Sequence, residues 1–238
     1  KGGKFCILEG NYNYEYNEIE YRELYGMVLS QRVNNELVNM DYLNTVPTCL
    51  KNIPDIRKKD LLMATITLKY TPSNSISYAK NGMVIGVGAG QQNRVDCIKL
   101  AGNKSRIYNM RKHPKCVELL DKFRHGVKRQ DKTNAIIKYI NNDFTQKELD
   151  NWNLLFEDEN KPVLLTQGDK DQYLKNINDV AISSDAFFPF RDNIDYASRY
   201  GVKYIIQPGG SIQDKNIIEA CNEYGMIMAI SNKRMFLH

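Results

Sequence analysis

The sequence predicts an α/β protein whose sheet is mixed but mostly parallel, with helices packed on its faces. The main observation is the last third of the chain, where segments typical of strands and helices alternate: residues 180–184, 193–200, 202–207, 214–224 and 226–230. Strands and helices that alternate at this spacing favour parallel strands joined by crossover helices. A second observation is the pair Asn81-Gly82 between two β-rich runs, because this pair is the strongest short-range hairpin signal.

The first sixty residues carry weaker signals. Residues 5–9 (FCILE) predict a short strand, and residues 18–31 carry apolar groups at nearly helical spacing behind a possible N-cap at Asn17. Residues 35–60 mix short helix and loop. The chain opens KGGKFCIL without a methionine, so we expect it to be part of a longer protein.

The middle of the chain predicts a hairpin followed by helices. Residues 75–80 and 83–88 form the hairpin, and the second strand runs into a glycine-rich turn and a helix over 91–102. Residues 113–177 then read as helices with polar breaks. In the last third, Gly225 follows residues 214–224 where a helix is expected to end, and glycine is the preferred residue there.

Composition excludes several classes of protein. The 238 residues include 26% charged and 42% hydrophobic residues, and the net charge of +5 is scattered, whereas a nucleic-acid partner would call for a basic stripe. No apolar run approaches the roughly 20 residues that span a bilayer. The five cysteines include no CxxC pair, so we expect a reduced, cytoplasmic protein.

The sequence shows no motif for a metal site or for a catalytic nucleophile. The histidines His113, His125 and His238 are not spaced as metal ligands, so no zinc or other metal site is expected from them. The chain has no GxSxG motif for a serine nucleophile. Cys97 and Cys221 fall on apolar helix faces, where a buried and inert thiol is expected.

The glycine run Gly86–Gly90 has two interpretations. A strand, a glycine-rich turn and a helix N-terminus form a natural anion site, and Arg94 in the first turn of the helix would strengthen it. Alternatively, the glycines only allow the strand and the helix to pack closely. The spacing favours close packing but leaves both interpretations open.

Two further segments follow expected parallel strands. Ser183–Asp192 (SSDAFFPFRD) combines a carboxylate with an aromatic and proline platform, which suits a flat heterocycle, and residues 207–212 (QPGGSI) follow the next strand. Ligands usually bind where parallel strands end. Ordinary strand-to-helix corners would explain both segments equally well.

Three long stretches resemble one family. Residues 70–104, 183–195 and 201–229 closely resemble the AICAR formyltransferase domain, which occurs fused to IMP cyclohydrolase and also alone. The resemblance implies transfer of a formyl group from 10-formyltetrahydrofolate to the 5-amino group of AICAR, giving FAICAR for purine (IMP) biosynthesis. It also implies a zinc-free, three-layer deaminase-like lobe over 60–238, with 1–59 as the end of a first similar lobe and its connection.

The resemblance assigns residues to both substrates. Asn74 would hold the carboxamide of AICAR and Arg234 its phosphate, while Asp192 would face the pterin edge of the folate. Asp185 would contribute to a structural alkali-cation site. The complete assignment is Asn74, Arg94, Phe187 and Arg234 for AICAR, and Val95, Pro189, Phe190, Asp192, Ser211 and Ile212 for the folate.

The resemblance also implies what this chain lacks. The family's catalytic Lys-His pair is expected upstream of Lys1, so the chain alone should bind reactants without catalysing the transfer. A non-catalytic nucleotide- or folate-binding module of the same fold is therefore the alternative. The family forms homodimers with shared active sites, and no nucleic-acid or membrane partner is expected. Leu237 stands where the family has a histidine, and Tyr108-Asn109 replaces a tryptophan pair.

Overall fold

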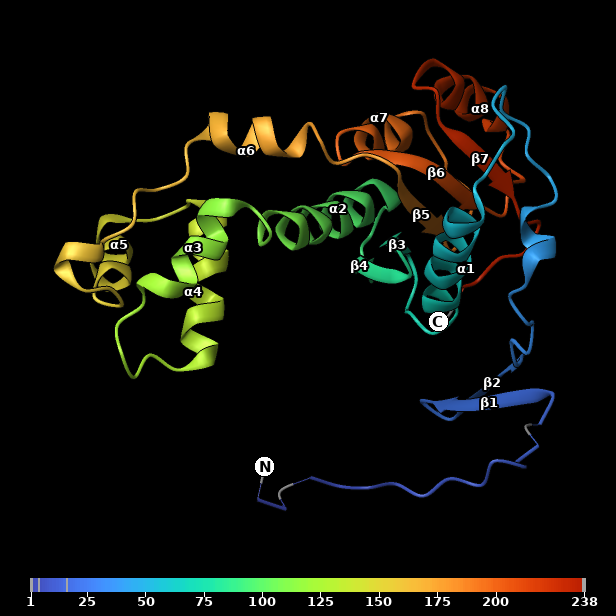
Figure 1. Ribbon diagram of the computed structural model, residues 1–238. Helices are drawn as coiled ribbons and strands as arrows, with labels where there is room; N and C mark the ends of the chain where they lie inside the picture. The colour runs from blue at the N-terminus through green and yellow to red at the C-terminus, as the bar shows by residue number, and fades with distance from the viewer. Residues whose placement is uncertain (1, 4, 16, 237–238) are drawn as a thin grey trace. The chain divides into compact units, whose positions relative to one another are not determined.

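A computed structural model describes residues 2–3, 5–15 and 17–236 of the chain. It divides into two compact units, Lys1–Leu37 and Val38–His238 (Figure 1). The expected division into lobes at residue 60 stays a prediction about the parent fold. Within the second unit, a helix already begins at Asp55 and runs through that position.

The described part of the first unit contains a β-hairpin, so the helix predicted over 18–31 is wrong. Strands β1 (Ile19–Leu24) and β2 (Met27–Arg32) pair antiparallel, and Tyr25 and Gly26 form the turn with φ of 53° and 77°. Positive φ at both central residues is the geometry that lets a two-residue turn match the twist of the strands. The strand predicted for 5–9 is also wrong, because these residues have no regular secondary structure.

The second unit is built on a five-stranded sheet with the order β4-β3-β5-β6-β7. The pairs β5-β6 and β6-β7 are parallel, while β3 is antiparallel to both of its neighbours. Four strands therefore run in one direction and β3 runs against them, which confirms a mixed α/β sheet. The strands are β3 (Ser75–Lys80), β4 (Met83–Ala89), β5 (Val180–Ser184), β6 (Val202–Gln207) and β7 (Ile227–Ile230).

The hairpin predicted at Asn81-Gly82 is confirmed. These two residues join β3 to β4 with φ of 54° and 75°. The buried carboxylate of Asp60 fixes the turn, because Oδ2 accepts from the backbone N–H of Asn81 at 3.0 Å and Oδ1 accepts from that of Gly82 at 2.6 Å. Both backbone N–H groups of the turn thus donate to one carboxylate, which lies on the helix Asp55–Lys69.

Helices cover both faces of the sheet, which gives three layers (Figure 1). Alternate residues of a strand point to opposite faces. Thus Ile205 joins the core under one set of helices, whereas Tyr204 and Ile206 join the core under α1. The helices are α1 (Asp55–Lys69) on one face and α2 (Arg94–Met110), α7 (Asp192–Ser198) and α8 (Asp214–Glu223) on the other.

The segment before α1 belongs to the second unit. It includes the short 3-10 helix η1 (Met40–Leu43), and its backbone meets the edge strand β7, where the carbonyl of Thr45 accepts from the N–H of Ile230 at 2.8 Å. The amide oxygen of Asn222 on α8 accepts from the N–H of Cys49 at 2.7 Å. These contacts cover the outer edge of the sheet.

The helices predicted within 113–177 are confirmed and form a core of their own. Trp152 lies at its centre, stacked on Tyr139 with ring centroids 5.8 Å apart, and donates from Nε1 to the carbonyl of Ala135 at 3.0 Å. The elements are α3 (Pro114–Lys122), α4 (Arg129–Asn141), α5 (Gln146–Asn153), η2 (Asp158–Asn160) and α6 (Gln167–Leu174). Within the described ranges, no helix is long and apolar enough to cross a bilayer.

Candidate ligand site at the carboxyl rim

One edge of the sheet collects the polar residues singled out in the sequence. We call it the carboxyl rim: the edge where β4, β5, β6 and β7 end and where β3 begins. The register pairs Ile76 of β3 with Ser184 of β5, so Ser75 and Asp185, which adjoin these residues, lie close together, and Asn74 directly precedes Ser75. Residues 110 positions apart in the chain thereby meet at one point, because the backbone N–H of Ser75 donates to Asp185 Oδ2 at 3.0 Å.

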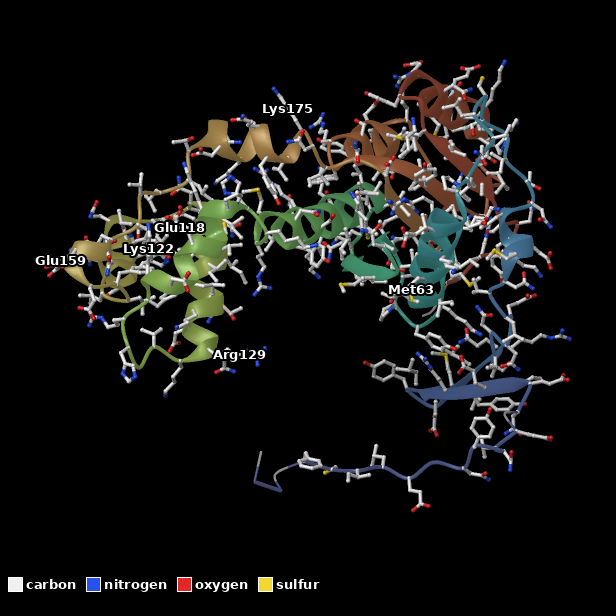
Figure 2. All side chains as sticks on the ribbon, in the orientation of Figure 1. Met63, Glu118, Lys122, Arg129, Glu159 and Lys175 are labelled. Carbon is white, nitrogen blue, oxygen red and sulfur yellow. The ribbon has the colours of Figure 1, made fainter. Side chains whose placement is uncertain are left out.

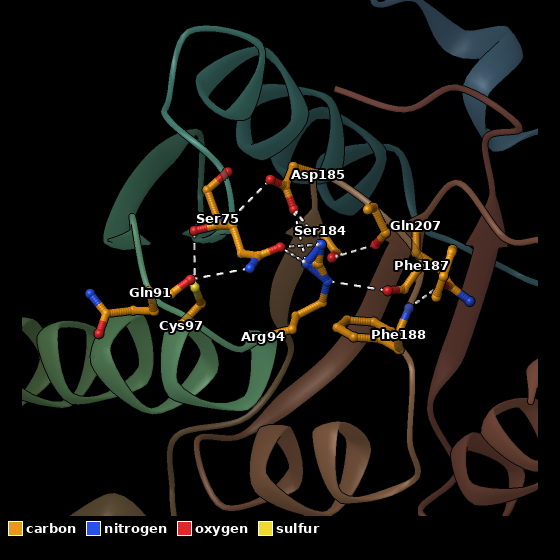
Figure 3. A network of polar contacts seen from close by, with 11 residues as sticks. Ser75, Gln91, Arg94, Cys97, Ser184, Asp185, Phe187, Phe188 and Gln207 are labelled. Atoms are coloured by element: carbon orange, nitrogen blue, oxygen red, sulfur yellow. Dashed lines mark hydrogen bonds and ion pairs between the residues drawn. The ribbon is translucent and has the colours of Figure 1, made fainter. Parts of the chain in front are cut away.

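Arg94, the first residue of α2, is at the centre of a polar network on this rim (Figure 3). Its Nη2 lies 3.0 Å from Asp185 Oδ1, and its Nε donates to the carbonyl of Phe187 at 3.2 Å. Both terminal nitrogens also reach Asn74 Oδ1, at 3.4 Å from Nη1 and 3.1 Å from Nη2. The guanidinium therefore joins the start of α2 to the start of β3, through Asn74, and to the end of β5, through Asp185.

The Arg94–Asp185 pair is buried. The side chain of Arg94 is 5% exposed and that of Asp185 is 0% exposed. Burial lowers the pKa of Arg94 from its ordinary value, while the negative charge of Asp185 acts in the opposite direction. Arginine remains charged in this environment, because its unperturbed pKa is far above neutral pH. The rim therefore contains a compensated charge pair that is shielded from solvent.

The same network fixes the side-chain amide of Asn74. Arg94 can only donate, so it requires the amide oxygen of Asn74 to face it. The other end of the amide, Nδ2, donates to the carbonyl of Gln91 at 3.1 Å. The backbone carbonyl of Asn74 accepts from the N–H of Gly90 at 3.0 Å and from Cys97 Sγ at 3.0 Å. The orientation of this amide is thus set by its surroundings.

A cleft of about 320 Å³ opens beside the network. The aromatic ring of Phe187 forms one wall, and the guanidinium of Arg234 stands 5.5 Å from the centre of that ring. An arginine at this distance is attracted by the face of an aromatic ring. The lining residues are Asn74, Gln92, Asn93, Arg94, Ala186, Phe187, Pro189 and Phe236. The structure thus brings the four residues assigned to AICAR to one place.

The residues assigned to the folate are more dispersed. Pro189 lines the cleft, and Val95 is the second residue of α2, next to Arg94. Phe190 is 64% exposed and Ile212 is fully exposed, on the segments that follow β5 and β6. Ser211 lies on the same segment as Ile212, and Asp192 is exposed at the start of α7. Their folate-binding role stays a prediction.

Close packing is confirmed as the role of two glycines in the run Gly86–Gly90. A Cβ at Gly86 would stand 2.2 Å from the carbonyl oxygen of Ala101, and one at Gly88 would stand 2.3 Å from that of Cys97. Both distances are impossible without movement of the α2 backbone. Gly90 has open space around it but a φ of +65°, and its N–H is used by Asn74. The glycines therefore allow β4 and α2 to approach each other.

Gln207 at the end of β6 is a site residue that the sequence did not single out by its side chain. It is 1% exposed, and its Oε1 accepts from the N–H of Phe188 at 2.8 Å (Figure 3). This bond holds the backbone beside Phe187, whose carbonyl also accepts from Arg94. A glutamine at the end of an apolar strand was the available signal, because a buried amide must be hydrogen-bonded.

The described residues contain no group of three or more histidine, cysteine, aspartate or glutamate side chains that could hold a metal ion. The carboxylate of Asp185 accepts from Arg94 and from Ser75, so its partners here are donors of the chain itself. The alkali-cation role of Asp185 stays a prediction. Leu237 and His238 lie outside the described residues.

The fold and the rim define an α/β protein with a candidate ligand site where its parallel strands end. Residues 1–104 match the family model described as AICARFT/IMPCHase bienzyme. This match, over somewhat less than half of the chain, supports an AICAR formyltransferase-related domain, as the resemblance indicated. It includes Asn74 and Arg94, whereas Asp185, Phe187 and Arg234 lie beyond it.

Proposed function

We propose that the carboxyl rim binds AICAR and a reduced folate during formyl transfer from 10-formyltetrahydrofolate to the 5-amino group of AICAR. The observation that carries the proposal is the fixed amide of Asn74, held by Arg94 at the mouth of a cleft walled by Phe187. The family match to residues 1–104 supports a role in purine biosynthesis.

Asn74 is poised to donate to its ligand. Its Oδ1 is occupied by Arg94, but Nδ2 carries two hydrogens and Gln91 accepts only one of them. The second hydrogen can bond to a carbonyl oxygen, and the carboxamide of AICAR presents one. The amide of Asn74 is already ordered, so this bond forms with little further loss of side-chain entropy.

The aromatic ring and the cation suit the rest of the nucleotide. Phe187 offers the face of its ring to a flat imidazole, and Arg234 supplies a guanidinium that matches a phosphate in shape and charge. The folate would lie against Val95, Pro189, Phe190, Asp192, Ser211 and Ile212. In this arrangement the carboxylate of Asp192 accepts from the N–H edge of the pterin.

Proton transfer must come from elsewhere in the parent protein. The amine of AICAR is a poor nucleophile, so a base must remove its proton as the new C–N bond forms. We propose that the catalytic Lys-His pair lies upstream of Lys1. The residues of the rim bind and orient the reactants. We also propose that the parent protein forms a homodimer and lies in the cytoplasm, where cysteines stay reduced, as the five free cysteines here are.

The direct test is an assay of the full-length parent protein with AICAR and 10-formyltetrahydrofolate. FAICAR should form, and it should not form with residues 1–238 alone. Absence of product from intact, folded parent protein would contradict the transferase proposal and favour a non-catalytic binding module.

The folate assignment has its own test. Asp192→Ala should weaken folate binding by about tenfold, because one charge-assisted hydrogen bond contributes about 1.5 kcal/mol or more. The matched control is Asp121→Ala, because Asp121 is an exposed carboxylate on α3 that belongs to neither proposed substrate site. Equal folate affinity for Asp192→Ala and the wild type would exclude a pterin contact.

A further inference from the structure

A second cleft lies away from the carboxyl rim. It has a volume of about 560 Å³ and is formed by the C-terminal half of α2, the end of α6 and the turn from α7 into β6. Gly201, at its wall, precedes the first residue of β6, so the cleft lies at the edge where the parallel strands begin. Arg94 and Arg106 are twelve residues apart on α2, which places the two sites roughly 18 Å apart along the helix.

Positive charge dominates this second cleft. Arg106, Lys175 and Arg199 line it, and Asp171 supplies the single carboxylate of the lining. None of the ion pairs found among the described residues involves any of these three cations. Asp171 accepts from Gln167 at 2.7 Å. Among the described residues, these three cations therefore have no anionic partner, and the guanidinium of Arg199, which lines the cleft, lies 4.4 Å from the centre of the Tyr196 ring. Lys175 directly follows α6 (Figure 2).

An aromatic ring forms the other wall. Tyr200 packs against Gly102 so closely that a Cβ there would lie 2.5 Å from the ring. Its ring also meets Tyr78 edge-on, with centroids 6.1 Å apart, and its hydroxyl donates to Asn103 at 3.2 Å. The ring of Tyr200 is thus held in place. Leu174 and Ile177 add aliphatic surface beside it.

Positive charges act on the hydroxyl of Tyr200. Burial raises the pKa of its hydroxyl, while the positive charges of Arg106, Arg199 and Lys99 act to lower it. Arg106 on α2 and Arg199 after α7 line the same cleft as Tyr200, although they come from different elements. Two arginines and an aromatic ring thus line one cleft.

We propose that this cleft is a second ligand site, separate from the carboxyl rim, for a small organic phosphate of nucleotide size. The guanidinium groups of Arg106 and Arg199 bind the phosphate, since each offers paired donors that match its oxygens. Lys175 adds a point charge at the margin. The flat part of the ligand lies against Tyr200, Leu174 and Ile177. The volume falls within the range of about 300–1,000 Å³ that is typical of small-molecule sites.

Calorimetry with defined probes tests the proposal. Adenosine 5′-monophosphate is titrated into the protein, with adenosine and inorganic phosphate as partial probes. We expect the monophosphate to bind more tightly than either probe. The double variant Arg106→Gln/Arg199→Gln should weaken it at least tenfold, and Lys175→Gln by a smaller factor. Arg111→Gln is the matched control, because Arg111 is an exposed cation at the end of α2 that does not line the cleft.

A second titration distinguishes binding in this cleft from binding at the carboxyl rim. The same titration in Arg234→Gln removes the phosphate partner proposed at the rim and should leave a site that still depends on Arg106 and Arg199. Lys175 is exposed, so Lys175→Gln remains informative if the double variant fails to fold. The proposal is overturned if the monophosphate affinity is the same in the wild type, the double variant and Lys175→Gln, or if adenosine binds as tightly as its monophosphate.

Discussion

Arg94 and Asp185 form a buried ion pair, with Nη2 of the arginine 3.0 Å from Oδ1 of the carboxylate. The two residues lie 91 positions apart in the chain. Their pairing ties the start of α2 to the end of β5. It also sets the orientation of Asn74, because the same guanidinium donates to the amide oxygen of Asn74. One charge pair thus links the stability of the rim to the position of its proposed ligand contact.

Removal of the charge at Asp185 should be strongly destabilising. Asp185→Asn leaves Arg94 buried without its counter-charge, and loss of one partner of a buried pair costs about 3–5 kcal/mol. The free energy of unfolding from urea titration measures this loss. The control is Glu223→Gln, which breaks the exposed Arg191–Glu223 pair and should cost about 1 kcal/mol or less. Equal losses in the two variants would contradict the role given to the buried pair.

Gly88 should not tolerate a side chain. Gly88→Ala places a Cβ against the backbone carbonyl of Cys97, so β4 and α2 must separate, at a cost of about 1–3 kcal/mol. Thermal unfolding followed by circular dichroism measures the loss. Gly168→Ala is the matched control, because a Cβ there meets only Thr166 Oγ1 at 3.7 Å and the residue lies in α6. A Gly88→Ala protein as stable as Gly168→Ala would favour a role of Gly88 other than packing.

The cysteines should divide into two reactivity classes. Cys6 and Cys49 are exposed, whereas Cys97, Cys116 and Cys221 are buried. Burial raises the pKa of Cys116 to about 11 and that of Cys221 to about 12, so both thiols stay protonated at pH 8. Mass spectrometry after brief treatment with iodoacetamide at pH 8 should show labels on Cys6 and Cys49, and on the other cysteines only in denaturant. Rapid labelling of Cys221 in the native protein would contradict the buried core.

Glu148 should contribute stability that is lost in acid. Its pKa is lowered to about 2, first by the hydrogen bond from Lys138 and then by those from Thr145. A lowered pKa in the folded state gives stability that is present above the ordinary value of 4.5 and disappears as pH falls toward 2. Glu148→Gln should therefore be less stable than the wild type at pH 7, and the two proteins should converge near pH 2. Urea titrations across this range measure the difference, and a difference independent of pH would exclude the linkage.

The two hairpins show how far local patterns predict this fold. Asn81-Gly82 predicts its turn because both residues readily adopt positive φ. Tyr25-Gly26 adopts the same geometry, but tyrosine carries no such signal, and the apolar spacing of 18–31 also fits a helix. The alternation of strands and helices in the last third was predictable because its strands are short apolar runs, which are typical of buried parallel strands.

The residues of the candidate site could be predicted, but the hydrogen bonds and ion pairs between them could not. Asn74, Arg94 and Phe187 could be named from resemblance, and the structure brings them together at the rim. The partner of Arg94 could not be deduced from spacing, because Asp185 approaches only through the antiparallel pairing of β3 with β5. The side chain of Gln207 depends likewise on the neighbouring strand. These contacts arise from the pairing of strands that are distant in the sequence, and no local sequence pattern predicts that pairing.

The central claim is that Asn74, held by Arg94, donates to the carboxamide of AICAR. The most direct measurement compares the affinity of the full-length protein and its Asn74→Ala variant for AICAR and for 5-aminoimidazole ribonucleotide, which lacks the carboxamide. Loss of one hydrogen bond to the carboxamide should weaken AICAR about tenfold and leave the second ligand unchanged. Equal weakening of both ligands, or no change for AICAR, would contradict the account.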